Sequence, residues 1–105
     1  ENTKYFYWVT PEGQGKGYLG EKNDEKKFFL EINSRVLGEI KALLSWKMPE
    51  LEDLKIWFWF KEEKAYLVSI KFREELEKML SEEMIYPENL SFQLKSSEIR
   101  GEWQA

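Results

Sequence analysis

Two apolar runs separated by four polar residues constrain the fold of this chain more than any other feature. The first, LKIWFWF (54–60), alternates its side chains with the period of a β-strand, and the second, AYLVSIKF (65–72), follows the polar tetrapeptide KEEK. Strands of this length joined by a short polar connection are typical of a β-hairpin. The sequence therefore predicts a hairpin over residues 54–72.

The other segments predict three further strands and two helices. Strands are expected over KYFYWVT (4–10), FFLEI (28–32) and LSFQLK (90–95), which are rich in aromatic and β-branched residues. A helix is expected to begin at Asn33 or Ser34, which can cap it, and to end before Pro49, because apolar residues follow at helical spacing. A second helix is expected over REELEKMLSEEM (73–84), with its leucines and methionines in one apolar stripe.

From residue 28 onward, the expected order is strand, helix, strand, strand, helix, strand. This is the split βαβ arrangement of ferredoxin-like domains. We therefore predict an α+β fold with a ferredoxin-like βαββαβ core, an additional N-terminal strand, and two helices on one face of an antiparallel sheet. At 105 residues, the chain is expected to form a single domain, with an N-terminal strand and Gly-rich loop (1–26), a core (27–95) and a tail carrying Trp103 (96–105).

The chain contains neither cysteine nor histidine. The lack of cysteine excludes disulfides, thiolate metal sites and cysteine nucleophiles. Histidine is the usual general base near neutral pH and the commonest protein ligand for transition metals. We therefore predict that the protein is not an enzyme, has no catalytic residues, and binds neither a metal nor a cofactor.

The stretch GKGYLG (15–20) matches the dinucleotide-binding pattern G-x-G-x-x-G. Such a site also needs a helix that begins at the loop and holds the pyrophosphate at its N-terminus, but the polar segment EKNDEKK after Gly20 has no apolar stripe. A P-loop would need Ser or Thr directly after Lys16, where Gly17 stands. We therefore expect a flexible turn, with contact to a partner or a phosphate cradle as alternatives.

Acidic residues suggest two further candidate sites. Asp53, Glu62, Glu63 and Lys64 loosely imitate the spacing of metal-dependent nucleases, but the last three are expected at a hairpin tip rather than in a cleft. The pairs Glu74/Glu75 and Glu82/Glu83 would bind a cation only if they converged with a second segment. We expect both sets to be solvated.

Aromatic residues on the first strand of the predicted hairpin form the most promising surface. If Ile56 and Phe58 point at the helices, alternation sends Trp57 and Trp59 to the opposite face, where Phe29 of the preceding strand can join them. We expect these rings to be covered by another segment or molecule. The candidates are the N-terminal strand, the tail with Trp103, a protein partner, a second subunit and stacked nucleic-acid bases.

The stretch LGEIKALLSWKMPELEDLKIWFWF (37–60), followed by the acidic helix EELEKMLSEEM (74–84), is similar in its order of elements to small bacterial immunity proteins. The similarity covers about two thirds of the chain as a pattern of elements, without signature residues. It implies an inhibitor that neutralises a cognate toxin by covering a basic active site with an acidic surface.

The net charge of −4 disfavours polyanionic ligands. We therefore predict a non-enzymatic protein-binding domain, either an inhibitor or antidote of the immunity type or an accessory factor. The expected partner is a protein, such as a basic toxin or nuclease domain, or a second copy of the chain. The predicted interface comprises Trp57, Trp59, Phe29, Glu62, Glu63, Glu74 and Glu75.

The alternative function is single-stranded nucleic-acid binding on the aromatic sheet face. No apolar run approaches the roughly 20 residues that a membrane helix needs. We therefore expect no membrane association and a cytoplasmic location.

Overall fold

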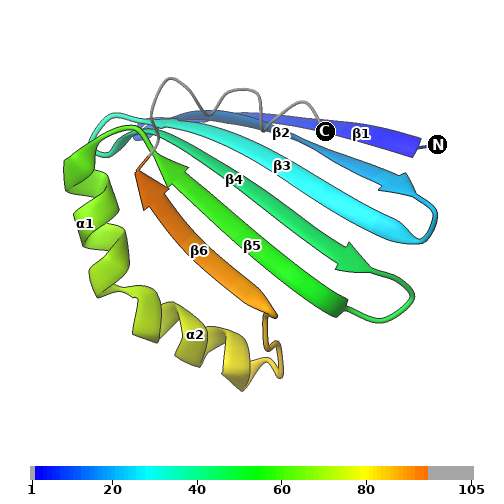
Figure 1. Ribbon diagram of the computed structural model, residues 1–105. Coiled ribbons are helices and arrows are strands. Elements are labelled where there is room, and N and C mark those ends of the chain that lie inside the picture. The colour runs from blue at the N-terminus through cyan, green and yellow to red at the C-terminus, as the bar shows by residue number, and fades with distance from the viewer. Residues whose placement is uncertain (1, 95–105) are drawn as a thin grey trace.

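The computed structural model describes residues 2–94, which form one sheet and two helices. The elements are β1 (Asn2–Thr10), β2 (Gly13–Lys22), β3 (Glu25–Ser34), β4 (Gly38–Lys47), β5 (Glu52–Phe60), α1 (Glu63–Lys71), α2 (Arg73–Glu82) and β6 (Asn89–Leu94). The strands lie side by side in sequence order, as Figure 1 shows. β1 to β5 form an antiparallel meander, and β6 runs parallel to β5 after the two helices.

This topology contradicts the predicted ferredoxin-like core. Five strands precede both helices, so the order is βββββααβ rather than βαββαβ, and the sheet is mixed rather than antiparallel. The parallel pair needs a long crossover connection, which α1 and α2 supply. The prediction succeeded for the N-terminal strand, the strands at 28–32 and 54–60, the helix that begins at Arg73 and the last strand.

The helix predicted before Pro49 is instead strand β4. Its apolar side chains serve both sides of the sheet: Leu44 packs toward the core, while Leu43 lies in one cross-strand row with Phe29 and Trp57 on the other side. Such a run fits a helix and a doubly buried strand equally well. Pairing with a strand on each edge decides between them. The helix on which the resemblance to immunity proteins depended is therefore a strand.

The residues expected to cap that helix form a turn into β4. The hydroxyl of Ser34 accepts hydrogen bonds from the amides of Val36 and Leu37, at 3.2 and 3.1 Å. A helix cap makes the same kind of bond, which is also the bond of a serine turn. Gly38 then takes a positive φ of 80°, a conformation that glycine adopts without steric cost.

The second strand of the predicted hairpin, residues 65–72, is helix α1. β5 already pairs with β4 on one edge and with β6 on the other, so no edge of β5 is available to this segment. Ala65 is the one residue of α1 buried among those described. The alternation that resembled a strand thus leaves most apolar side chains of α1 on the surface.

The segment expected to be loop between residues 11 and 27 forms β2 and two tight turns. Pro11 and Glu12 connect β1 to β2. Asn23 and Asp24 connect β2 to β3 with positive φ angles of 53° and 67°, as in the type I′ turns of two-residue hairpins. The sequence did not predict a strand here because β2 is rich in glycine, which is depleted in strands.

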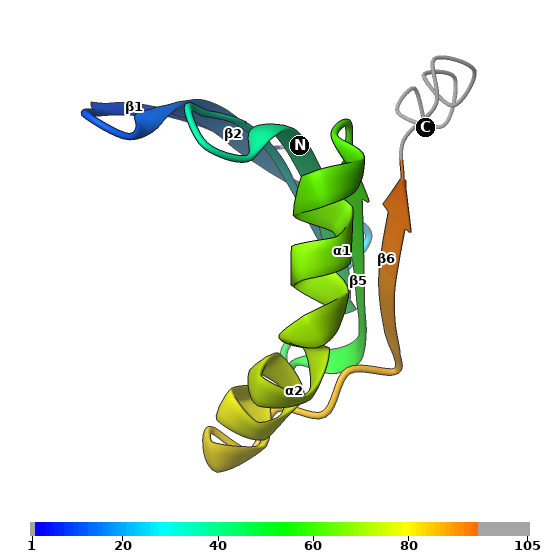
Figure 2. The same ribbon diagram turned by 90° about the vertical axis from the view of Figure 1, so that its left-hand side faces the viewer.

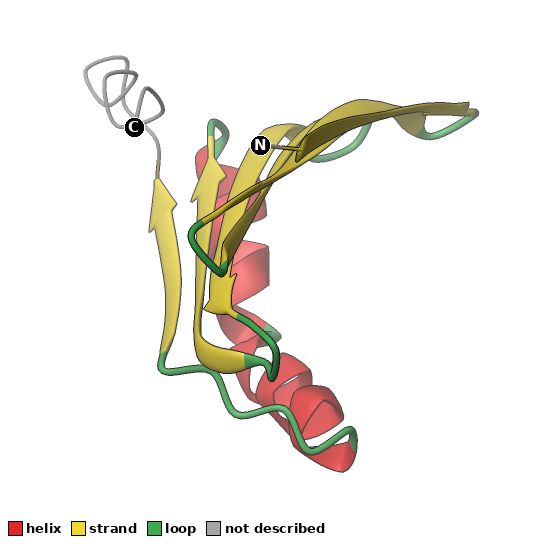
Figure 3. Ribbon diagram, turned by 90° about the vertical axis from the view of Figure 1, so that its right-hand side faces the viewer, coloured by secondary structure: helices red, strands yellow, loops and turns green. Residues whose placement is uncertain are grey.

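The sheet bends strongly, and both helices lie on its concave side, next to β5 and β6 (Figures 2 and 3). We call this side the helix face and the opposite side the outer face. Leu54, Ile56 and Leu90 form the buried cluster between sheet and helices, and Leu76 and Leu80 of α2 pack against it. The core is therefore at the β5–β6 end of the sheet, away from β1.

Candidate binding surfaces

The G-x-G-x-x-G match lies within strand β2, not in the flexible turn that we expected. A Cβ on Gly15 would overlap the indole of Trp8 across the strand, and a Cβ on Gly17 would lie 2.8 Å from the carbonyl oxygen of Phe29. Gly20 has no neighbouring atom within 4 Å of such a Cβ. The chain then continues into β3, without a helix that could hold a phosphate. The first two glycines therefore serve strand packing.

Two of the three aromatic residues predicted for the interface are buried. Phe29 is 8% exposed and Trp59 is 5% exposed; Trp57 is half-buried. All three side chains belong to the outer face by register. Trp59 also donates a hydrogen bond from Nε1 to Oε1 of Gln93 at 3.1 Å. These rings are therefore largely buried by contacts within the fold.

The N-terminal strand does not cover these rings. β1 pairs with β2 at the edge of the sheet, and β2, β3 and β4 separate it from β5. The tail with Trp103, the other intramolecular cover that we considered, lies outside the described residues.

An aromatic row crosses the outer face and becomes more exposed toward β1. The rings of Phe29 and Tyr18 stack at 5.1 Å between centroids, and Tyr5 follows at 5.9 Å from Tyr18. Exposure rises from 8% at Phe29 to 39% at Tyr18 and 78% at Tyr5. The exposed aromatic surface is therefore on β1, a site that sequence reasoning missed although the run KYFYWVT signalled it.

Tyr18 has the one resolved perturbed ionisation among the described residues. Burial raises the pKa of its hydroxyl above the ordinary value of 10.0, and the nearby charges of the Glu31 carboxylate and of the ionisable Tyr5 hydroxyl add to this increase. All three causes disfavour the phenolate. A hydroxyl that stays protonated near neutral pH fits a packing role in the aromatic row better than a catalytic role.

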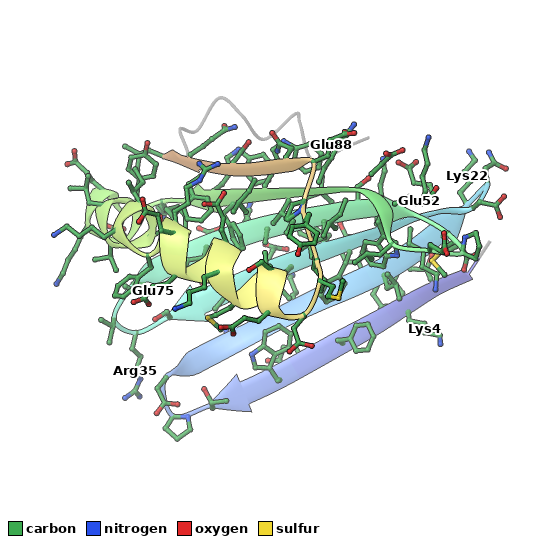
Figure 4. All side chains as sticks on the ribbon, turned by 90° about the horizontal axis from the view of Figure 1, so that it is seen from below. Lys4, Lys22, Arg35, Glu52, Glu75 and Glu88 are labelled. Atoms are coloured by element: carbon green, nitrogen blue, oxygen red, sulfur yellow. The ribbon has the colours of Figure 1, made fainter. Side chains whose placement is uncertain are left out.

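The glutamates predicted for the interface are exposed and lie on the helices. Glu62 is the N-cap of α1 and Glu63 its first residue, and Glu74 and Glu75 lie in the first turn of α2. Figure 4 shows Glu75 beside the helices, at the opposite end of the strands from Glu52 and Lys22. The structure therefore does not place these carboxylates together with the outer-face aromatics.

A small apolar pocket opens where α1 meets α2. It has a volume of about 200 Å³, and its lining residues are Phe58, Phe60, Ser69, Phe72, Leu76 and Phe92. The guanidinium carbon of Arg73 lies 5.7 Å from the centroid of the Phe92 ring, a cation–π geometry. The pocket thus combines an apolar interior with a charged margin.

Phe72 of this pocket and further apolar side chains on both helices are exposed. Leu67 is 51% exposed, Phe72 is 55% exposed and Met79 is 62% exposed. Val68 and Ile70 are also exposed. Clusters of exposed apolar side chains framed by charge are typical of protein interfaces. We call this surface, formed by α1, Phe72 and α2, the helical layer.

Charge is unevenly divided along the chain. Residues 2–47 contain eight basic and six acidic residues, whereas residues 48–94 contain six basic and eleven acidic ones. Lys16, Lys27 and Lys55 lie on the outer face by register, and Lys16 and Lys55 are paired loosely with Glu31 and Glu88 at 3.9 and 3.6 Å. The acidic charge is therefore concentrated on the half with the helices.

The nuclease-like set does not form a site. Asp53 is near the start of β5 and pairs with Lys47 at 3.4 Å, whereas Glu62, Glu63 and Lys64 follow the other end of that strand. The seven strand residues after Asp53, at about 3.3 Å each, separate the two groups by roughly 25 Å. Within residues 2–94, no group of acidic side chains is arranged to hold a metal ion.

Neither of the two described helices is long and apolar enough to cross a membrane. Comparisons of the chain with protein-family models, with curated proteins and with solved structures gave no match.

Proposed function

We propose that this protein acts by binding another protein through its helical layer, without chemistry of its own. The observation that carries the proposal is the exposed apolar surface of α1 and α2, with a pocket of about 200 Å³ at their joint and exposed glutamates in the first turn of each helix. Interfaces commonly consist of apolar anchors that fill pockets, surrounded by a charged rim. The helical layer has both exposed apolar side chains with a pocket and charged side chains.

The acidic rim favours a basic partner. Glu74 and Glu75 stand two and three positions after Phe72, which lines the pocket, and Glu63 begins α1. Charges of opposite sign across an interface speed association and exclude partners of the same charge. An inhibitor or antidote that covers a basic active site is the form of action we propose for such a surface, with an accessory factor as the broader class.

A charge-reversal experiment with a matched control tests this proposal. The tagged protein is used to isolate its partner from the native host, and the Kd of the purified pair is measured at several salt concentrations. Changing Glu74→Lys together with Glu75→Lys should weaken binding at least tenfold, because electrostatic attraction to a basic partner is lost. The fold is checked by circular dichroism.

The control is Glu12→Lys with Glu21→Lys, which makes the same change in net charge at two exposed positions outside the helices, one in the β1–β2 turn and one on β2. It should leave the Kd within about twofold, because both positions are outside the helical layer. If both double variants weaken binding equally, net charge and not the helical layer governs association. Unchanged binding in the helix variant would contradict the proposal directly.

Single-stranded nucleic-acid binding is the second candidate, and the outer-face lysines favour it. Lys27, Ser45 and Lys55 lie in one cross-strand row next to the row of Phe29 and Trp57. Bases could stack on rings while the lysines contact phosphates. Titration with a short RNA, followed by tryptophan fluorescence, should then show affinity that falls steeply with salt. No fluorescence change at low salt would exclude this candidate.

A further inference from the structure

Strand β1 is a sheet edge without the usual protection. All nine of its residues pair with β2 in an uninterrupted register, and no described strand lies on its other side. Edge strands are normally short, bulged, or interrupted by proline and several charges. β1 has no proline or glycine, and Lys4 is its one charged residue. Its free backbone groups can therefore accept another strand.

The side chains of β1 are unusually exposed for their type. Tyr5 is 78% exposed, Tyr7 70%, Val9 66% and Phe6 45%. A large aromatic side chain has roughly 200 Å² of surface, so on the order of 500 Å² of side-chain surface is open on each copy. Two such surfaces, with the strand backbones added, reach the roughly 1,000 Å² that a specific interface needs.

The sequence of β1 is complementary to itself in the antiparallel direction. If two copies of NTKYFYWVT pair about Phe6, Tyr5 lies opposite Tyr7 of the second copy, and Thr3 lies opposite Val9. On the other face, Lys4 lies opposite Trp8, which suits a cation–π contact. No like charges would face each other, and each residue pairs with one from the same face of the sheet.

We propose that this chain forms a twofold homodimer in which β1 pairs antiparallel with β1 of a second copy, centred on Phe6. The two six-stranded sheets become one continuous sheet. The helices do not obstruct this contact, because they pack beside β5 and β6 at the far end of the sheet (Figure 1). In Figure 4, β1 forms the edge of the sheet and Lys4 projects beside it. The interface is isologous, as in most dimers.

The proposed register makes a test by charge pairing possible. Light scattering after gel filtration and sedimentation velocity measure the mass, which should be twice the 12.7 kDa of one chain. Tyr5→Glu with Tyr7→Glu places two glutamates opposite each other in both halves of the interface, and should give a monomer. Tyr5→Lys with Tyr7→Glu places opposite charges there instead, and should restore the dimer.

Both double variants replace the same two exposed rings, so loss of aromatic surface alone cannot explain a difference in mass between them. Circular dichroism establishes that each is folded. As a second readout, Phe6→Cys should form an intermolecular disulfide on oxidation, because Phe6 faces its own copy at the twofold axis. Thr3→Cys should not, because Thr3 faces Val9.

Three results would overturn the proposal. The first is a wild-type protein that stays monomeric up to several hundred micromolar. The second is a dimer that persists with Tyr5→Glu and Tyr7→Glu, which would place the contact elsewhere, for example on the helical layer. The third is a monomer with Tyr5→Lys and Tyr7→Glu when the wild type is a dimer, which would contradict this register. The first and third results leave the proposed function of the helical layer untouched, whereas a dimer contact on that layer would compete with the proposed partner.

Discussion

Gly15 shows how a single position in a strand is restricted to glycine by its neighbours. Its backbone lies under the indole of Trp8 from the adjacent strand. The two residues pair directly across β1 and β2. A ring that lies over a cross-strand glycine shields the backbone of both strands, and this contact leaves no space for a methyl group.

Gly15→Ala should therefore destabilise the protein by about 1–3 kcal/mol, the usual cost of overpacking. Displacement of Trp8 should also change the tryptophan fluorescence spectrum. Urea denaturation measures the free energy of unfolding.

Gly20→Ala is the matched control in the same strand. A Cβ there meets no atom within 4 Å, so the change should be neutral, or stabilising by up to about 1 kcal/mol because it reduces unfolded-state entropy. Equal effects of the two substitutions would show that the contact with Trp8 does not restrict Gly15.

Tyr18 links the aromatic row to stability at alkaline pH. Its folded-state pKa is raised above 10.0, so the native state holds the proton more tightly than the unfolded state does. The resulting stabilisation is fully present below about pH 10 and is lost as pH rises through the folded-state pKa.

Tyr18→Phe should abolish this part of the pH dependence. Once the loss of the hydroxyl is subtracted as the constant difference seen at pH 8, the free energy of unfolding of the wild type should fall below that of Tyr18→Phe above pH 10. Urea denaturation at a series of pH values measures this divergence. Parallel curves across the whole range would contradict the raised pKa.

At the scale of elements, the core depends on contacts between β5, β6 and the helices. Leu54 is 6% exposed in the central cluster, whereas Leu67 on α1 is 51% exposed. Leu54→Ala should cost about 2–5 kcal/mol, as expected for a buried leucine. Leu67→Ala removes the same atoms from the surface and should change stability by less than about 0.5 kcal/mol.

Both leucine variants are measured by thermal and urea denaturation. If Leu67→Ala destabilises the protein as much as Leu54→Ala, α1 packs more tightly than the structure indicates. If Leu67→Ala leaves the stability of the protein unchanged but weakens partner binding, the result supports a binding role for the helical layer.

α2 should be the first element to open locally. None of its residues is buried, while β3 and β4 each pair along both edges. Elements with few buried contacts exchange their amide hydrogens through low-energy openings. Native-state hydrogen exchange should give α2 a clearly lower opening free energy than β3 and β4. Equal protection in all three would contradict this expectation.

The same elements show where sequence reasoning succeeded and failed. α2 was predicted correctly because its charged residues and apolar stripe fit a single period. β4 and α1 were assigned to the wrong class because their apolar residues fit two periods equally well. For α1, the deciding fact is that β6, which comes later in the chain, occupies the edge of β5.

At the scale of the whole molecule, one continuous sheet connects the two charged halves. Each strand pairs with the next, and the core cluster lies at one end. We expect a single cooperative unfolding transition, as is usual for a domain of this size. Far-ultraviolet circular dichroism and tryptophan fluorescence should give coincident urea curves. Separate transitions would show that the β1–β2 end opens independently.

The candidate surfaces were predictable only in part. The sequence indicated that Trp57 and Trp59 leave the helix face and that the glutamates of α2 are solvated. It did not indicate that Phe29 and Trp59 are buried, that the glutamates lie apart from them, or that β1 is the exposed aromatic edge. These properties depend on strand order, which the local periodicity of the sequence does not reveal.

The amino-acid sequence by itself determined an α+β chain that lacks thiol and imidazole groups, together with the positions of β1, β3, β5, α2 and β6. Local patterns of side chains and propensities are sufficient for these features. Only the tertiary structure decided that β4 is a strand, that α1 is a helix and that β1 is an edge. The physical reason is that each outcome depends on which distant segment supplies hydrogen-bonding partners and covers the apolar side chains.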